Sequence, residues 1–502
     1  MQAAEIARAV GGLYVELPKD WPPNYDINDF HKDTRNLKTV AALLELAKAP
    51  EIKESSVESP ALGNTLNDSG NAARLVKIFG QDIRWLPRIK KWMIWNGHSW
   101  VMDEDGAIMR MAIQTAKFIY REAAEELDAD KARSIARWAS ASQFHRGLSA
   151  MIDLAKAQPG ISISMSVLDQ KPMLLGTQSG VVDLTTGMLS DANRLDYITR
   201  TISAPYESNA TCTDWEKFLA RCFSDNPKLI EFIQRAVGYC LTGLTDEQVI
   251  FFLIGDGCNG KSVFLETIRA VLGAYAMQTQ AETLMQRKGG HVNNDIACLN
   301  GARMVSVIEI EKGRRLAESL VKQLTGGDQI SARFLYSEFF EFKPTFKFWL
   351  AANDKPVIQG EDHGIWRRII LIPFSVRIPQ EEQDKKLSIK LAAEAAGILQ
   401  WAIRGALEWQ RVGLCPPSEV REATDQYQRD MDVFLNWLDE RCQQGSKESA
   451  RANELFTSHR EWAEQSGLGA LTQKELSEKL QKHGFRKEKD RFGIKYVGLS
   501  RL

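Results

Sequence analysis

The sequence predicts an α/β protein whose central domain follows a mainly helical N-terminal region and precedes a small basic unit. Three observations predict this fold class. Residues 249–272 give an apolar strand, a glycine-rich loop and an amphipathic helix, in that order. Three later apolar stretches, 304–308, 346–352 and 369–374, have the length and composition of buried strands. Before the glycine-rich loop, over residues 213–244, apolar residues recur at helical spacing.

The composition is that of a globular protein. The chain has 502 residues, 44% hydrophobic and 26% charged, a length for which roughly two to four domains are expected. A net charge of −1 excludes a uniformly basic nucleic-acid binder, so such contacts must use local patches or a pore. Seven cysteines without a C-x-x-C pair or zinc spacing fit a reducing cytoplasm. Because no apolar run approaches about 18 residues and the N-terminus has no apolar signal core, we expect a cytoplasmic protein without membrane contact.

The glycine-rich loop carries the pattern G-x-x-x-x-G-K-[ST], which is typical of phosphate-binding loops. Its glycines let successive backbone N–H groups and a helix N-terminus face phosphate oxygens. Lys261 is expected to reach the β- and γ-phosphates and to be exposed before a nucleotide binds, and Ser262 is expected to ligate Mg²⁺. ATP and Mg²⁺ are therefore the predicted cofactors. The predicted nucleotide-binding residues of the loop are Gly255, Asp256, Gly257, Cys258, Asn259, Gly260, Lys261 and Ser262.

Polar residues follow two of the later strands. Glu309 and Glu311 follow the strand at 304–308, and alternation along an extended chain puts both on one face. A carboxylate at such a strand end holds Mg²⁺ or polarises the attacking water, so Glu309 is the predicted metal ligand and Glu311 the predicted base. Asn353 follows the strand at 346–352, where an amide can hydrogen-bond the γ-phosphate or orient water. A charged, solvated loop is the alternative for the two glutamates.

Two arginines, Arg367 and Arg368, directly precede the strand at 369–374. An arginine there can reach the nucleotide of a neighbouring subunit and neutralise charge that develops in phosphoryl transfer. A solvated arginine or a simple ion pair is the alternative. Between the strands, residues 329–335 and 339–343 predict a β-hairpin.

Residues 255–374 resemble a superfamily 3 helicase of the AAA+ class, and most of all the primase-helicases of phages, satellite elements and plasmids, which are related to the poxvirus helicase-primase. The resemblance rests on GDGCNGKS, the E-x-E strand end, LVKQLTGGDQISARFLYSEFFEFKPTFKFWLAAND and IWRRIILIPF. It implies a homo-hexameric ring with ATP between subunits, single-stranded or forked DNA in the pore, and 3′→5′ translocation. It further implies a sensor role for Asn353, a trans-acting finger at Arg368 in preference to Arg367, and a contact from Lys322 to the neighbouring subunit's nucleotide.

The same resemblance implies that the hairpin grips DNA, with Arg333, Phe334 and Tyr336 near its tip. The viral helicases carry a tip rich in lysine and histidine, whereas Phe334-Leu335-Tyr336 is mostly apolar. Which hairpin residue touches DNA therefore stays open.

The region 416–502 predicts a separable DNA-binding unit. It opens at Pro416-Pro417, and a helix over 418–441 and a polar break at 443–448 precede two helices and a hairpin, the layout of a winged helix. From Thr472 to Tyr496, eight Lys/Arg against four Asp/Glu give +4, a charge that suits phosphate contacts. A protein-docking module is the alternative. The predicted DNA-binding residues here are Lys474, Lys479, Arg486 and Lys487.

The N-terminal half divides into three segments. Residues 1–50 resemble the tail of a Toprim primase domain through Asp26-Ile27-Asn28-Asp29-Phe30, but the Toprim glutamate and D-x-D are not found, so no primase activity is expected of this chain. Residues 51–73 read as a polar linker. Residues 74–212 are expected to form a mainly helical collar domain, which resembles the region before the ATPase in primase-helicases, and residues 213–415 the AAA+ domain.

Together these features predict an ATP-dependent replicative DNA helicase of a phage, satellite or plasmid, acting in the cytoplasm of a bacterial host. A primase domain or host replication proteins are further expected partners. The alternative is an AAA+ DNA-dependent ATPase that acts as a loader or packaging motor without separating strands.

Overall fold

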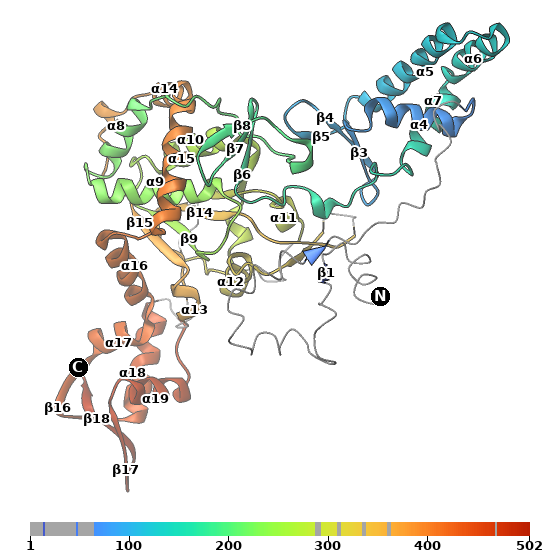
Figure 1. Cartoon of the computed structure of the whole chain (residues 1–502). Helices are drawn as coiled ribbons and strands as arrows, with labels where there is room; N and C mark the ends of the chain where they lie inside the picture. The colour runs from blue at the N-terminus through green and yellow to red at the C-terminus, as the bar shows by residue number, and fades with distance from the viewer. Residues whose placement is uncertain are drawn as a thin grey trace, which may run out of the picture.

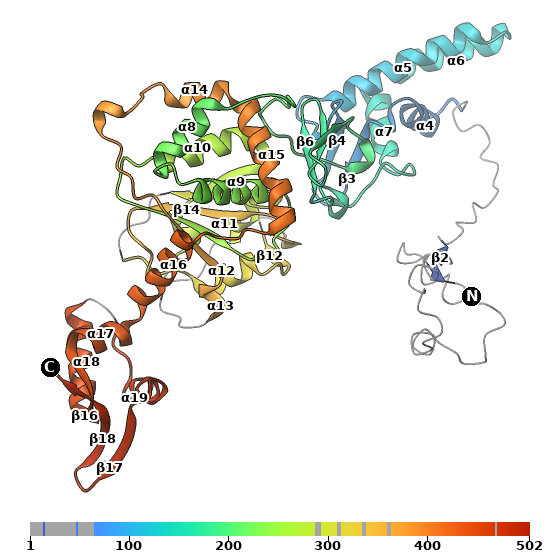
Figure 2. The same ribbon diagram turned by 60° about the vertical axis from the view of Figure 1, so that its left-hand side comes forward.

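The computed structural model describes residues 65–286, 293–308, 313–333, 338–358, 363–466 and 469–502. It also describes the backbone of two short strands, β1 (Tyr14–Val15) and β2 (Ala47–Lys48), which pair antiparallel. The described chain forms an N-terminal unit, a central sheet domain and a C-terminal unit. The N-terminal and C-terminal units lie on opposite sides of the sheet domain (Figures 1 and 2).

The N-terminal unit begins before the predicted end of the linker. Helix α4 (Asp68–Phe79) starts inside it, and the Asn67 side chain accepts a hydrogen bond from Gly70 N at 2.8 Å. The linker predicted over 51–73 is therefore wrong from Asp68 onward, while residues 51–64 lie outside the described part. Asn96 and Gly97 lie in the turn that joins two strands of a small antiparallel sheet in this unit. The further elements of this half are β3 (Ile83–Leu86), β4 (Lys91–Trp95), β5 (Trp100–Met102), α5 (Ala107–Glu125), α6 (Ala129–Ser142) and α7 (His145–Ala155).

The second half of the region 74–212 contains a small antiparallel sheet. Strands β6 (Leu174–Thr177), β7 (Gly180–Asp183) and β8 (Met188–Ser190) pair antiparallel, so the prediction of a mainly helical domain over 74–212 is wrong for this half. Buried side chains of this small sheet belong to the core of the central domain. The Arg303 guanidinium also donates to Leu174 O at 2.6 Å. Because these strands pack into its core, the central domain starts near β6 and not at residue 213, where the sequence predicted its beginning.

The central domain is a five-stranded parallel sheet in the order β10-β11-β14-β9-β15. The strands are β9 (Ile250–Ile254), β10 (Ala276–Thr279), β11 (Met304–Ile308), β14 (Lys347–Ala352) and β15 (Ile369–Pro373). All the carboxyl ends of a parallel sheet meet at one edge. In this order β9, the strand that precedes the glycine-rich loop, has β14 and β15 as neighbours. Strand β11 lies one strand further away, beyond β14.

Helices cover both faces of this sheet (Figure 2). Alternate side chains of β9 enter different cores: Phe251 and Leu253 pack on one side, Ile250 and Phe252 on the other. The first core contains α8 (Thr213–Cys222), α9 (Pro227–Leu241), α10 (Lys261–Leu272), α14 (Leu387–Ala393) and α15 (Ala395–Val412). The second core contains α11 (Asn293–Cys298), α12 (Glu318–Thr325), α13 (His363–Trp366) and α16 (Ser418–Met431). No helix of the described segments is long and apolar enough to cross a bilayer.

Helices α9 and α15 cross so closely that only glycine fits at the contact. A Cβ on Gly238 would meet backbone atoms of Gly405 and Ala406, and a Cβ on Gly405 would meet Gln234 O. Such an approach leaves no room for a methyl group unless the two backbones separate.

Gly238→Ala is therefore expected to lower the free energy of unfolding by about 3 kcal/mol. At an uncrowded helical position the same change raises stability by up to about 1 kcal/mol, so the sign of the effect is diagnostic. Urea denaturation measures it, with Gly257→Ala as the control because a Cβ there meets nothing within 4 Å. A Gly238→Ala protein as stable as the wild type would contradict the close crossing.

The predicted hairpin is confirmed for its described residues. Strands β12 (Ile330–Ala332) and β13 (Phe340–Phe342) pair antiparallel, with Ile330 opposite Phe342. The turn residues 334–337, which include Phe334 and Tyr336, lie outside the described part.

Helix α16 packs on the sheet domain although it follows the Pro416-Pro417 break. The Tyr427 hydroxyl donates to Pro356 O from a fully buried position, and Thr424 Oγ1 accepts a hydrogen bond from Leu371 N at 3.0 Å. The C-terminal unit begins after α16, at Asp432. The carboxylate of this residue accepts hydrogen bonds from the first turn of α17 (Val433–Arg441).

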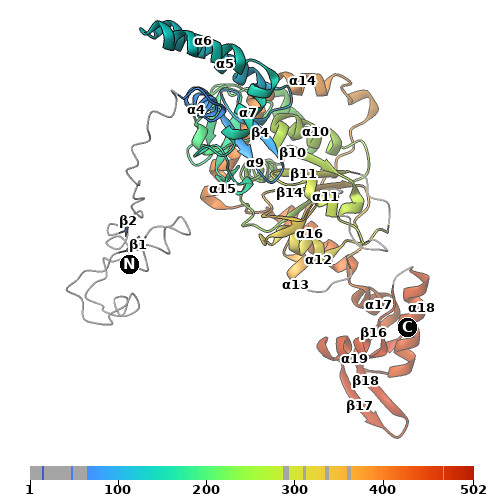
Figure 3. The same cartoon turned by 90° about the vertical axis from the view of Figure 1, so that its right-hand side faces the viewer.

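The C-terminal unit contains a strand where the sequence predicted a polar break. Strand β16 (Cys442–Arg451) pairs antiparallel with β18 (Gly493–Arg501) on both sides of an irregularity between Gln444 and Ser449. The predicted break at 443–448 is therefore wrong for residues 443 and 444, while the irregularity falls inside it. This strand lies at the sheet edge with only Cys442 and Ala450 buried, because β18 supplies the apolar side chains. The other elements are α18 (Ala452–Gln465), α19 (Gln473–Lys482) and β17 (Arg486–Asp490). Figure 3 shows this unit extending away from the sheet domain beyond α16.

Candidate functional site

The glycine-rich loop joins the carboxyl end of β9 to the start of α10, as predicted. Gly255 lies against Phe374, since a Cβ there would meet the Phe374 carbonyl. Gly260 has φ 91°, and its Cβ would lie 2.5 Å from Cys222 Sγ of α8. The Cys258 carbonyl accepts a hydrogen bond from Ile378 N at 2.8 Å. The loop is thus fixed from two sides, with the N-terminus of α10 at its end.

Asn259 holds the loop together from within. Its Nδ2 donates to Asp256 O and to Phe374 O, both at 3.1 Å, and the residue is 3% exposed. Its Oδ1 accepts a hydrogen bond from Lys261 Nζ at 3.2 Å. One buried amide therefore connects the loop, the segment after β15 and the lysine.

Lys261 is buried at 6% exposure, so the expectation of an exposed lysine is wrong. Besides Asn259, its Nζ donates to Gly255 O and to Asn353 Oδ1, the latter at 3.3 Å. Burial lowers the pKa of the ammonium, and the Asp256 carboxylate opposes that shift. An ammonium surrounded by neutral oxygens gains by exchanging one of them for a charged phosphate oxygen.

The Lys261–Asn353 hydrogen bond joins the ends of two neighbouring strands. Ala352, the last residue of β14, pairs with Ile254 of β9, and Ile308, the last residue of β11, lies opposite Ala351. The structure therefore brings together the predicted lysine and the predicted sensor amide, with the end of β11 beside them. Glu309 and Glu311 themselves lie outside the described residues, and their roles stay predictions.

These groups fit a nucleoside triphosphate with Mg²⁺. The glycines leave the loop free of side chains at their positions, and the N-terminus of α10 presents backbone N–H groups. The Lys261 ammonium supplies a positive charge beside them. Ser262 is exposed in the first turn of α10, where its hydroxyl is available to a metal ion.

Arg367 and Arg368 lie at the amino ends of the strands, whereas this loop lies at their carboxyl ends. Arg368 O accepts a hydrogen bond from Ile250 N at 2.7 Å, which puts the pair level with the start of β9. A strand of five residues at about 3.3 Å per residue separates its two ends by roughly 15 Å. Neither guanidinium is therefore placed to serve the loop of its own chain.

The two arginines differ in exposure. Arg368 is 8% exposed, and its guanidinium donates to Thr325 Oγ1 at 3.1 Å and to Gly364 O. Arg367 is exposed, and its Nη2 donates to Gln248 Oε1 at 2.6 Å. Gln248 Oε1 also accepts a longer hydrogen bond, 3.4 Å, from Arg368.

Gln248 is a residue that sequence reasoning missed. It precedes β9 with a left-handed φ of 54° and orients both guanidinium groups. A glutamine before an apolar strand gives no signal of such a role, which depends on the pairing of β9 with β15. Lys322 lies on α12, one turn before Thr325, and is half-buried.

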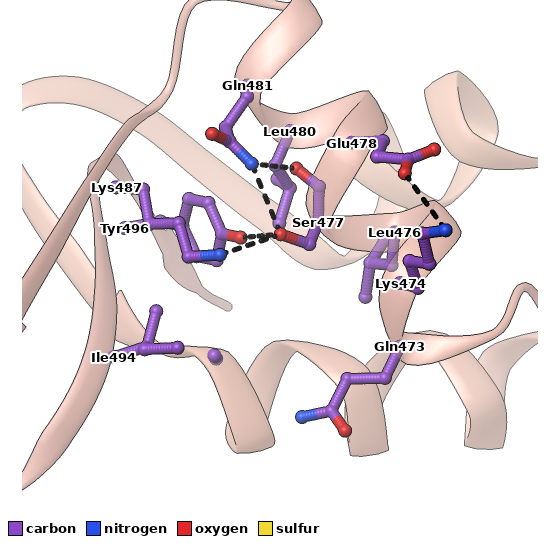
Figure 4. Close-up of a pocket in the computed structure, with 11 residues that line it drawn as sticks. Gln473, Lys474, Leu476, Ser477, Glu478, Leu480, Gln481, Lys487, Ile494 and Tyr496 are labelled. Carbon is purple, nitrogen blue, oxygen red and sulfur yellow. Dashed lines mark hydrogen bonds and ion pairs between the residues drawn. The ribbon is translucent and has the colours of Figure 1, made fainter.

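The predicted DNA-contacting residues of the C-terminal unit occupy different places. A groove of about 540 Å³ lies between α19 and the β17–β18 hairpin (Figure 4). Lys474 and Lys487 line it, with polar Ser477, Gln481 and Tyr496 between them. The Ser477 hydroxyl lies 2.6 Å from Tyr496 Oη and 3.3 Å from Lys487 Nζ, which ties the helix to the hairpin.

Lys479 and Arg486 lie outside this groove. Lys479 points to α17, with Nζ 3.4 Å from Asp432 Oδ1 and 5.4 Å from the Phe434 ring centre. Burial, with Lys482 nearby, lowers its pKa to about 8. Arg486 is exposed and pairs with Glu488 at 2.9 Å. Of the four predicted residues, the structure brings together Lys474 and Lys487.

Two family descriptions match the chain. Residues 72–224 match the family described as D5 N terminal like, and residues 253–368 match a family of unknown function, DUF5906.

Several viral proteins are similar to the chain. A candidate helicase of Acanthamoeba polyphaga mimivirus is 28% identical over 60% of this chain and 34% of its own length. A candidate helicase of Frog virus 3 is 27% identical over 51% and 28%. A candidate primase of African swine fever virus is 22% identical over 59% and 34%. The chain thus spans about a third of the length of these relatives.

Among solved structures, the C-terminal region of NrS-1 in its apo A form covers 85% of this chain and 99% of its own, with 11% identity and a TM-score of 0.47. The D5-like N-terminal region and the viral sequence matches relate the chain to the phage and viral primase-helicase family, as the sequence resemblance predicted.

Proposed function

We propose that this chain is an ATP-dependent replicative DNA helicase built on an AAA+ core. The observation that carries the proposal is the contact between Lys261 and Asn353 at the phosphate-binding loop. A buried ammonium and an amide meet where the last phosphate of a nucleotide would lie, which is the arrangement that phosphoryl transfer needs.

Each residue has a defined task in this proposal. The loop from Gly255 to Gly260 and the N-terminus of α10 bind the triphosphate. Lys261 neutralises the β- and γ-phosphates, and Asn353 orients the attacking water. Ser262 and Glu309 hold Mg²⁺, which polarises the phosphoryl group when bound, and Glu311 accepts the proton of the water.

The proposal includes a homo-hexameric ring that translocates 3′→5′ on single-stranded DNA. It is supported by the distance between Arg367 and the loop of its own chain, since a basic group at that edge can serve only a neighbouring subunit. Lys322 would reach the same neighbouring nucleotide. The hairpin of β12 and β13 would contact the strand in the pore, with Arg333 after β12 and Lys343 after β13 as exposed cations.

A forked-duplex assay separates this function from its alternative. A helicase is expected to separate the strands of a fork with a 3′ tail when ATP is present, and to do so more slowly with a 5′ tail. ATP hydrolysis stimulated by DNA without strand separation would instead support a loader or packaging motor.

The C-terminal unit is proposed to bind duplex DNA as a winged helix. Its elements follow the order helix, strand, helix, helix and hairpin, and the groove between α19 and the hairpin carries lysines on both walls. A groove with cations on two walls suits one sugar-phosphate strand.

Lys474→Ala with Lys487→Ala is expected to weaken duplex binding and to flatten the slope of log K against log[salt] by about 1.8, since each phosphate contact contributes about 0.9. Fluorescence anisotropy over a salt series measures the slope. Lys447→Ala with Arg460→Ala, an equal charge change on exposed residues of β16 and α18, is the matched control. An unchanged slope in the first variant would remove the groove from the DNA-binding surface.

A further inference from the structure

The turn between β3 and β4 presents a basic loop to the hairpin of the central domain. Residues 87–90 of this turn and Lys91, the first residue of β4, are exposed, and they place Arg88, Lys90 and Lys91 around Ile89. Lys90 has a left-handed φ of 52°, a conformation that glycine and asparagine adopt at a lower energetic cost than lysine. The fold thus holds a lysine at the tip of the turn despite a backbone cost.

One hydrogen bond ties this turn to the hairpin. Arg88 Nη2 donates to Phe339 O at 2.5 Å across 251 residues of sequence. Phe339 directly precedes β13, and the residue is 51% exposed. The Arg333 guanidinium, at the end of β12, lies 4.7 Å from the centre of that ring. Two parts of the chain therefore form one continuous surface.

The surface combines the two features that single-stranded nucleic acid requires. Cations follow the phosphates of an extended strand, and an exposed aromatic ring with an arginine over it offers a stacking platform for bases. The described residues of the turn and the hairpin carry a net charge of +3, on a chain whose total is −1. This charge is the sum of five cations (Arg88, Lys90, Lys91, Arg333 and Lys343) and two carboxylates (Glu338 and Glu341). An almost neutral protein that concentrates positive charge beside an exposed phenylalanine has a local electrostatic footprint for a polyanion.

We infer that the β3–β4 turn is a second arm of the single-strand binding site, which contacts the phosphates next to the strand held by the hairpin. The inference rests on the proposed helicase function and adds a contribution of the N-terminal unit to it. Arg88 couples the turn to the hairpin through Phe339, and Lys90 and Lys91 contact the phosphates. The ligand is single-stranded DNA, read by its backbone and its base faces.

The test is the salt dependence of binding of the full chain to a fluorescent oligothymidine. Changing Arg88, Lys90 and Lys91 together to alanine is expected to flatten the slope of log K against log[salt] by about 1.4, since Lys90 and Lys91 contact phosphates and each such contact on a single strand contributes about 0.7. The matched control changes Lys117, Lys131 and Arg137 to alanine, three exposed cations of α5 and α6, and is expected to keep the wild-type slope. Thermal unfolding of both variants confirms that they are folded.

The outcomes separate this inference from the proposed function. If the wild type binds the oligonucleotide and the turn variant keeps the wild-type slope, the inference is overturned while the helicase proposal stands. An equal loss of slope in both triple variants would also overturn it, because the effect would then follow net charge and not position. A wild type that neither binds the oligonucleotide nor hydrolyses ATP would overturn the proposed function itself.

Discussion

Lys261→Ala is expected to lower ATP hydrolysis at least about 10³-fold and to abolish strand separation with it. Lys261 is a cation of the glycine-rich loop, and its Nζ contacts both the loop and Asn353. Alanine removes the charge that would stabilise the transferred phosphoryl group, and no described side chain of the loop replaces it. Steady-state phosphate release with and without DNA measures the effect.

The same variant is expected to fold with a small loss of stability, about 1–2 kcal/mol. The lysine is buried, so Gly255 O, Asn259 Oδ1 and Asn353 Oδ1 lose a hydrogen-bond donor. Lys217→Ala, which removes an exposed lysine of α8 with a weak 3.6 Å ion pair to Asp214, is the control. Near-normal turnover in Lys261→Ala would show that ATP is hydrolysed elsewhere.

The core of the site could be predicted because its signals are local. The strand at 304–308 matches β11 residue for residue, and the loop after β9 starts α10 at Lys261 as its pattern requires. Short apolar runs and positions that only glycine can occupy depend little on distant parts of the chain. The polar residues at the strand ends could be assigned because parallel strands share one carboxyl edge.

The features that the sequence did not reveal depend on tertiary contacts. Strand β16 has almost no apolar pattern because it is an edge strand, and the buried apolar side chains of this sheet come mainly from β18. The burial of Lys479 follows from the packing of α19 on α17, and a lysine at helical spacing gives no sign of it. The same reason explains why Gln248 was missed and why Lys261 was expected to be exposed.

Arg367→Ala is expected to lower ATP turnover about 10³-fold while ATP binding, assembly and stability stay close to wild type. The family resemblance favours Arg368 as the finger, yet in the structure its guanidinium is buried and donates to Thr325 and Gly364. Arg367 is exposed beside it, and its guanidinium donates to Gln248 Oε1. We therefore propose that Arg367 enters the neighbouring subunit's site and that Arg368 positions it through Gln248.

Arg368→Ala separates the two roles. It is expected to cost about 2 kcal/mol of stability, because Thr325 Oγ1 and Gly364 O lose a buried charged donor. Denaturant unfolding and phosphate release, measured on both variants, give the comparison. A stable Arg368→Ala with lost turnover, beside an active Arg367→Ala, would reverse the assignment and make Arg368 the finger.

Mixed assemblies test whether the arginine acts in trans. Rings made from Arg367→Ala and Lys261→Ala protomers contain interfaces at which an intact Lys261 faces an intact Arg367, so they are expected to regain part of the turnover that each variant lacks alone. Because neither arginine lies within reach of its own loop, a single chain cannot supply this recovery. Native mass spectrometry establishes that the rings are mixed, and Arg367→Ala mixed with Arg367→Ala/Lys261→Ala is the control, since none of its interfaces contains the arginine. Equal turnover in the two mixtures would contradict a shared site.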